Sequence, residues 1–154
     1  MKGILNLLVA CAAISLVALP SISFSQQNAN INRDRLHGVG GFSAKGKGQA
    51  IVRGDGKIIV EGRGTVIVHA NRRDDIDVRG FGFKRQDGNH FYFEGRGRLE
   101  VKGKNISVDI TGDVDELKGA GNGSARLIGV GHYRSKGANG NWAGGGIDLI
   151  YHRK

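Results

Sequence analysis

The chain of 154 residues carries 27 glycines, a single cysteine and a formal net charge of +9. This length fits one domain, and the lone cysteine, Cys11, excludes a disulfide within the chain. A surplus of positive charge favours anionic partners such as lipopolysaccharide, acidic polysaccharide, nucleic acid or anionic lipid, although it also serves solubility alone.

Residues 1–25 have the profile of a signal peptide. Met1-Lys2 precede an apolar run from Ile4 to Leu19, after which the chain becomes polar. Ser23 and Ser25 supply the small residues that a signal peptidase reads, so we expect cleavage after Ser25. The mature protein is then periplasmic or extracellular, with no transmembrane segment.

Two alternatives to a cleaved signal peptide stay open. In the first alternative, the apolar run is kept as a membrane anchor, although its 16 residues are fewer than the ~20 that span a bilayer. In the second, Leu8-Val9-Ala10-Cys11 acts as a lipobox and Cys11 is lipidated. Residues 26–36 are polar, and we expect them to form a flexible lead-in.

A repeat of about 16 residues fills the remainder, residues 37–154. Its unit is apolar-x-apolar-x-Gly-x-Gly-x-apolar-x-apolar, and the clearest copy consists of Ile58, Val60, Gly62, Gly64, Val66 and Val68. Copies begin at residues 42, 58, 76, 91, 108, 125 and 140. Because successive side chains of a strand point to opposite faces, this alternation predicts strands and excludes helix for most of the domain.

Turn-forming residues lie between the copies and predict reversals between antiparallel strands. We expect these turns at residues 54–56, 71–74, 87–88, 103–105 and 139–140. The apolar parity is the same before and after Gly54-Asp55-Gly56, which predicts a three-residue loop. Such a loop tip would display the Arg53-Gly54-Asp55 triplet, which matches the adhesion sequence that integrins read.

These patterns predict an all-β fold of seven or eight antiparallel strands, a meander that forms a small coiled barrel or a sandwich. Glycine within a strand destabilises it by roughly 0.5–1 kcal/mol relative to alanine, so the glycines of the repeat must serve geometry. They permit sharp coiling or the close approach of an aromatic ring. The alternative is a β-solenoid with ~16-residue rungs, in which each Gly-x-Gly forms a corner.

The runs GKGQAIVRGDGKIIVEGRGTVIV, a second EGRG strand and GVGHYR resemble a loose group of small exported glycine-rich bacterial proteins. The resemblance covers roughly Gly38 to Arg134. It implies an exported all-β protein, and it implies no activity and no site residue.

The parity opposite to the buried one carries the candidate site. Its basic residues predict a surface that contacts an anionic polymer: Lys45, Lys47, Arg53, Lys57, Arg63, Arg96, Arg98 and Lys102. A solvated polar face is the alternative. Apolar residues on the same parity suggest a second covered face or a binding patch: Ile51, Ile59, Ile67, Phe81, Phe83, Tyr92, Ile128 and Val130. A bulge near Gly80 is expected to exchange the two faces there.

Signatures of catalysis, metals and cofactors are missing from the sequence. No nucleophile and base stand at a recognisable spacing, and the five histidines lie far apart along the chain. The acidic run at residues 112–116 lacks the ligand spacing of a calcium loop. We therefore expect no catalytic residue, no metal and no cofactor, and we find no specific nucleic-acid motif.

The leading hypothesis is a non-enzymatic structural or binding protein of the cell envelope, whose basic strand face contacts an anionic polymer or surface. Self-assembly into oligomers or fibres through edge strands is the alternative. A hydrolase-like enzyme built from scattered histidines and aspartates is the third possibility.

Overall fold

A computed structural model describes residues 37–135 and 138–152, so the predicted signal peptide, Cys11 and the lead-in 26–36 lie outside the described residues. Within those two ranges the chain is all-β, as the sequence predicts, with seven strands in one sheet and no α-helix. The elements are β1 (His37–Val39), β2 (Gly41–His69), the 3-10 turn η1 (Arg73–Asp75), β3 (Ile76–Arg79), β4 (Gly82–Asp87), β5 (His90–Ser135), β6 (Ala138–Asn141) and β7 (Ile147–His152).

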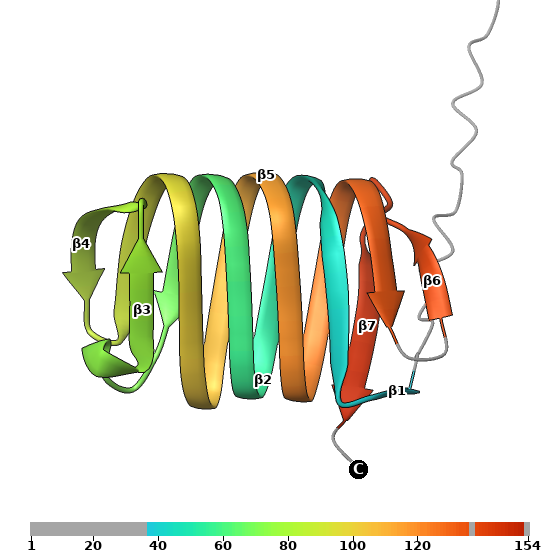
Figure 1. Ribbon diagram of the computed structural model, residues 1–154, viewed down its shortest axis with the longest axis horizontal. Helices are drawn as coiled ribbons and strands as arrows, with labels where there is room; N and C mark the ends of the chain where they lie inside the picture. Colours follow the sequence, from blue (N-terminus) through green and yellow to red (C-terminus); the bar gives the residue numbers. More distant parts are fainter. Residues whose placement is uncertain (1–36, 136–137, 153–154) are drawn as a thin grey trace, which may run out of the picture.

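Strands β2 and β5 are long, antiparallel to each other, and wound together as a coil (Figure 1). Most residues of β2 lie between two turns of β5 and pair with one residue in each of them. Gly112 of β5, for example, pairs with both Gly48 and Gly64, so one turn of β2 takes 16 residues. The sheet winds helically and does not close on itself, so the predicted barrel is wrong. The 16-residue repeat is one turn of the coil, as the solenoid alternative expects.

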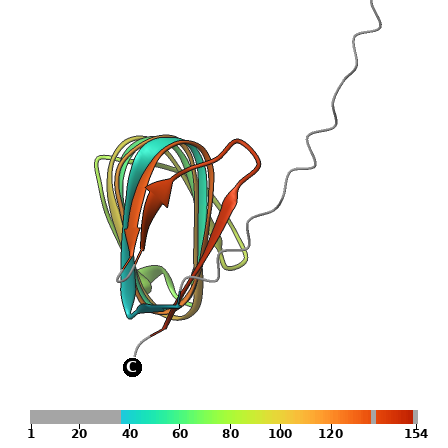
Figure 2. The ribbon, with the colours of Figure 1, turned by 90° about the vertical axis from the view of Figure 1, so that its right-hand side faces the viewer.

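The coil is flattened into two long sides that are joined by two curved edges (Figure 2). Glycines from successive turns stack at these edges, as in the pairing of Gly56 with both Gly103 and Gly121. We name the two stacks by their members. The first glycine edge contains Gly46, Gly48, Gly62, Gly64, Gly95, Gly97, Gly112, Gly129 and Gly131, and the second contains Gly54, Gly56, Gly103, Gly121 and Gly123.

Several predicted turns are wrong because the chain continues there as a strand without reversing. Gly54-Asp55-Gly56 lies inside β2, residues 103–105 lie inside β5, and residues 139–140 lie inside β6. The Arg-Gly-Asp triplet therefore sits on a curved edge of a continuous strand and not at a loop tip. The predicted breaks at 71–74 and 87–88 are confirmed by η1 and by the turn at Gly88-Asn89.

The core fills the interior of the coil. Val60 lies opposite Leu99 in one neighbouring turn and Leu117 in the other, and all three are 0% exposed. Burying each such side chain contributes about 1.5–3 kcal/mol. Phe81, assigned to the outward parity, is buried as well. The buried parity changes from Ile76 to Phe81 across Gly80, which has a φ of 84°, as the predicted exchange of faces requires. Phe83 does not follow, because it is 55% exposed, and the register shift lies between Phe83 and Arg85 rather than at Gly80.

One bulge in β5 shapes the surface described next. Val114 and Leu117 are both buried although an odd step separates them. The extra residue is Asp115, which has no partner in either neighbouring turn of β2. A bulge of this kind lets two successive side chains face the same way, so Asp115 and Glu116 both lie on the outer surface.

Candidate anion-binding surface

The eight predicted basic residues fall into three places on the coil. Four lie along the first glycine edge, Lys45, Lys47, Arg63 and Arg96, and three lie on the adjoining side, Lys57, Arg98 and Lys102. Arg53 lies on the opposite side, where it pairs with Ser107 and Ser124 in the neighbouring turns. The structure thus brings seven of the eight onto one continuous surface and separates Arg53 from them.

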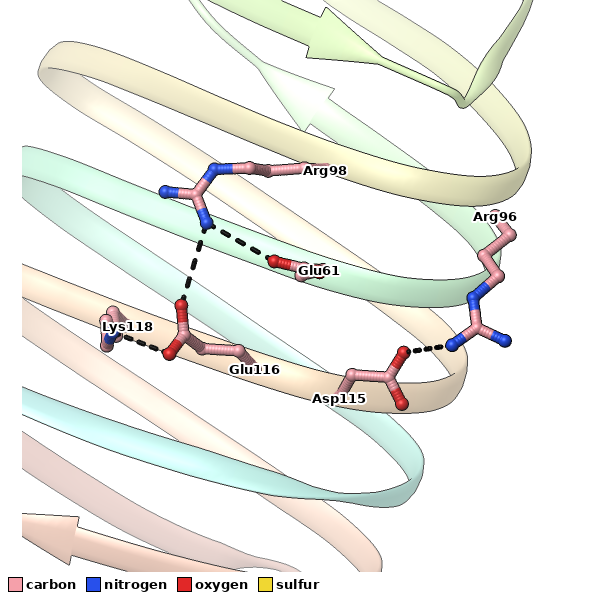
Figure 3. Close-up of polar contacts among 6 residues, drawn as sticks. All are labelled: Glu61, Arg96, Arg98, Asp115, Glu116 and Lys118. Carbon is pink, nitrogen blue, oxygen red and sulfur yellow. Dashed lines mark hydrogen bonds and ion pairs between the residues drawn. The ribbon is translucent and has the colours of Figure 1, made fainter.

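Residues of the adjoining side form a ladder of ion pairs, part of which Figure 3 shows. Arg98 Nη1 lies 3.3 Å from Glu61 Oε2 and 3.7 Å from Glu116 Oε2. The same Glu116 carboxylate is 2.5 Å from Lys118 Nζ. These contacts join three consecutive turns of the coil, so most of the positive charge on this side is already matched by carboxylates.

Glu100 is the other centre of the ladder. Its Oε1 accepts Lys102 Nζ at 2.8 Å and Lys57 Nζ at 2.9 Å. The hydrogen bonds from Lys102 and then Lys57 lower the pKa of the Glu100 carboxyl below its ordinary value. The pair with Glu100 likewise raises the pKa of Lys102. Glu100 therefore stays ionised to lower pH than an isolated glutamate.

The first glycine edge is less completely neutralised. Lys47 Nζ lies 3.4 Å from Asp113, and Arg96 Nη2 lies 3.0 Å from Asp115, which comes from the bulge (Figure 3). Arg63 stands directly opposite Arg96 in the next turn. Like charges directly opposite each other on neighbouring strands destabilise a sheet.

Lys45 and Arg63 are the cations that this edge leaves without compensation. In residues 37–135 and 138–152, no carboxylate lies within 4.0 Å of either side chain. Both line a concave region of about 620 Å³, here called the edge cavity, whose other polar walls come from Arg96, Asp113, Asp115 and His132. Because Asp113 and Asp115 already have cationic partners, the edge cavity has a net positive character.

Sequence reasoning missed the acidic partners and the cations beyond the repeat centres. Asp113 and Asp115 were assigned to surface charge, and Lys118, His132 and Arg134 were not singled out. A signal for the bulge is present in the sequence, because the buried parity changes from even at Val114 to odd afterwards. Reading that change as one extra residue would have placed Asp115 and Glu116 together on the surface.

Two of the histidines lie close together in the structure. The fold brings His69 and His90 together across neighbouring strands, with ring centroids 4.9 Å apart, although they are far apart along the chain. Within the described part of the chain, no group of three or more His, Cys, Asp or Glu side chains is arranged to hold a metal ion. Among the same residues no helix is long and apolar enough to cross a membrane.

Comparisons with known proteins add no family and no relative. A scan against protein-family models finds no match, and neither the curated proteins nor the solved structures contain a match to this chain. A functional proposal therefore depends on the geometry and charge of the surface itself.

Proposed function

We propose that the protein is an exported, non-enzymatic structural or binding protein of the cell envelope, and that its first glycine edge holds an anionic polymer. The observation that carries the proposal is the edge cavity, where Lys45 and Arg63 face solvent and, among the described residues, neither has a carboxylate within 4.0 Å. An anion bound there relieves the repulsion between Arg63 and Arg96 and replaces the missing counter-charge.

The coil suits an extended ligand because it repeats its surface at a fixed interval. Neighbouring turns lie about 4.8 Å apart, so the cations of the first glycine edge form a column with a rise of roughly 5 Å per strand. The column crosses four neighbouring strands, and its residues in order are Lys47, Asp113, Arg63 and Arg96. Three of the four are cations. A sugar chain with a carboxylate on each residue carries its charges at a similar interval, whereas a compact anion would use one position only.

The experiment compares binding of polygalacturonate and of neutral dextran to the mature chain. The double variant Lys45→Gln/Arg63→Gln removes the two uncompensated cations. Its matched control, Arg53→Gln/Lys104→Gln, removes the same charge from exposed positions away from the first glycine edge.

We expect the edge variant to bind polygalacturonate about 5- to 30-fold more weakly, because two exposed charge contacts contribute together about 1–2 kcal/mol. The control keeps more of the parent affinity, dextran does not bind, and raising the salt from low to high concentration weakens binding. Equal losses in the two variants, or binding that does not respond to salt, would contradict the proposal.

Self-assembly is a second candidate function, and strand β4 favours it. All six residues of β4 are exposed, and β4 pairs with β5 alone, so its outer edge has no neighbour among the described strands. Phe83 of this strand is 55% exposed. Lys84 and Arg85 beside it oppose edge-to-edge stacking. Sedimentation distinguishes the two functions, because a chain that stays monomeric at high concentration does not assemble.

A further inference from the structure

The end of the coil that carries β6 has a second concave region, here called the β6 hollow, with a volume of about 510 Å³. Figure 1 places β6 at the opposite end of the coil from β3 and β4. The charged and amide side chains that line the hollow beside His132 are Lys45, Asp115, Glu116, Arg134, Asn139 and Asn141. This volume is within the range of ~300–1,000 Å³ that small-molecule sites occupy.

The hollow has two structural causes. Contacts of Trp142 and Gly140 fix the position of β6, and the short side chain of Ser43 leaves space at the bottom of the hollow. Trp142, which follows β6, is buried and donates from its ring nitrogen to the carbonyl oxygen of His132 at 3.2 Å. Gly140 lies over the Tyr133 ring, where a Cβ would overlap the ring atoms. Ser43 is short and stands between Lys118 and Arg134 of the two neighbouring turns. The short side chain of Ser43 therefore forms the floor of the hollow, between the longer side chains of Lys118 and Arg134.

Cations gather on one wall of the β6 hollow. Lys45 pairs in register with His132, and Ser43 pairs with Arg134, so the four side chains stand at the corners of a rectangle of about 5 by 7 Å. Lys45 and Arg134 are exposed, and over residues 37–135 and 138–152 neither has a carboxylate within 4.0 Å. This wall fits one carboxylate group, which the fork of an arginine can bind through two hydrogen bonds.

The turn of β5 on the other side of Lys45 supplies two carboxylates to the hollow, and both are already paired. Glu116 is paired with Arg98 and Lys118, and Asp115 is paired with Arg96, all of them outside the hollow. Carboxylates held in this way accept hydrogen bonds from hydroxyl groups and repel a second anion. Asn139 and Asn141 of β6 pair with Arg134 and His132, so their amide groups flank the cations on the side away from Asp115 and Glu116. The Asn141 side-chain oxygen is 2.7 Å from His132 Nδ1.

We propose that the β6 hollow binds a short uronate segment of an acidic saccharide, with a carboxylate at Lys45 and Arg134 and with hydroxyl groups at Asp115 and Glu116 on one side and at the two asparagines on the other. A bare phosphate would satisfy only the cationic wall, and a neutral sugar would satisfy only the carboxylates and amides that flank it. The inference rests on the proposed function, because it names the sugar class that the anionic polymer presents at this end of the coil.

Calorimetry with trigalacturonate, maltotriose and inorganic phosphate tests the specificity. We expect trigalacturonate to bind, and we expect maltotriose and phosphate to bind at least tenfold more weakly. Equal binding of phosphate and trigalacturonate would show that the hollow recognises an anion only, and it would overturn the sugar assignment.

Two single variants separate the hollow from the edge. Arg134 lines the hollow but not the edge cavity, whereas Arg63 lines the edge cavity but not the hollow. We expect Arg134→Gln to weaken trigalacturonate binding at least tenfold and Arg63→Gln to weaken it less. Arg53→Gln, on the opposite side of the coil, leaves it unchanged. Circular dichroism checks that each variant is folded. Arg134→Lys keeps the charge, and we expect it to recover part of the affinity for trigalacturonate.

Failure of this inference and failure of the proposed function give different results. If polygalacturonate binds and depends on Arg63 but trigalacturonate does not bind, the hollow is not a uronate site and the proposed function stands. If trigalacturonate binds with the expected dependence on Arg134 but polygalacturonate binding does not depend on Arg63, the edge proposal fails and the hollow remains. If neither ligand binds, both are wrong.

Discussion

The substitution Gly56→Ala tests whether the glycine edges are a requirement of the coil. Gly56 has a φ of 131°, a conformation that side chains other than glycine rarely adopt. A Cβ at this position would overlap the carbonyl oxygen of Ala120 in the neighbouring turn and lie 3.1 Å from the Cα of Gly121. Neither obstacle is the end of a flexible side chain, so the backbone itself must move.

The expected magnitude follows from these two obstacles. A strained backbone conformation costs about 1–3 kcal/mol, and a displaced neighbouring backbone loses a hydrogen bond that contributes about 0.5–1.5 kcal/mol. Together they lower the free energy of unfolding by ~2–4 kcal/mol, a large part of the ~5–15 kcal/mol that keeps a domain folded. For a domain of this size, each kcal/mol lowers the melting temperature by about 4 °C, so we expect a fall of about 8–16 °C.

Thermal unfolding followed by circular dichroism measures the effect, with two further glycines as references. Gly144→Ala is the matched control, because it has no heavy atom within 4 Å of an added Cβ and no left-handed φ. Gly97 also lacks a left-handed φ, but its Cβ would overlap backbone atoms of Arg79 and Phe81, so Gly97→Ala isolates the steric part. If Gly56→Ala melts within about 2 °C of Gly144→Ala, the edge geometry described above is incorrect.

Three other measurements follow from the charges and buried groups. Ion pairs lower the pKa of Glu100, so its stabilising contribution is present above about pH 4.3 and is lost as the pH falls through the folded value. Glu100→Gln should make the melting temperature less sensitive to acid. Burial raises the pKa of Tyr151 to about 12, so its contribution is complete below about pH 10 and is lost between there and pH 12; Tyr151→Phe should reduce the alkaline loss of stability. Asp113→Asn removes the one carboxylate from the edge column and should tighten polygalacturonate binding about 2- to 5-fold, whereas Asp87→Asn, far from the edge, should have less effect.

The alternation of apolar residues predicted which side chains form the core, because it depends on a property that every strand shares. All even positions of β2 from Phe42 to Val68 point inward, and the non-glycine ones among them are buried. The pattern could not show whether the strand reverses at Gly54–Gly56. A three-residue loop and an uninterrupted bend both preserve the parity, so the same residues suit a hairpin and a coil.

One feature of the sequence does distinguish these folds. Within β2 the Gly-x-Gly pairs recur every eight residues, at 46 and 48, at 54 and 56, and at 62 and 64. A meander needs special turn residues once for each strand, whereas a flattened coil has two curved edges in every turn. The half-period of the glycines therefore indicates the coil, and the 16-residue apolar repeat alone does not.

The surface was harder to predict than the core because the coil places strands from the two halves of the chain alternately. Lys47 and Arg63 are 16 residues apart and reach the same edge, but a turn of β5 lies between them and contributes Asp113. The continuity of the basic column thus depends on a residue far away in sequence. The bulge at Asp115 then adds a residue to that same turn, and it supplies the carboxylate that pairs with Arg96. Because one insertion in β5 changes the charge beside two turns of β2, the binding properties of the edge depend on the register between the strands as much as on the basic residues themselves.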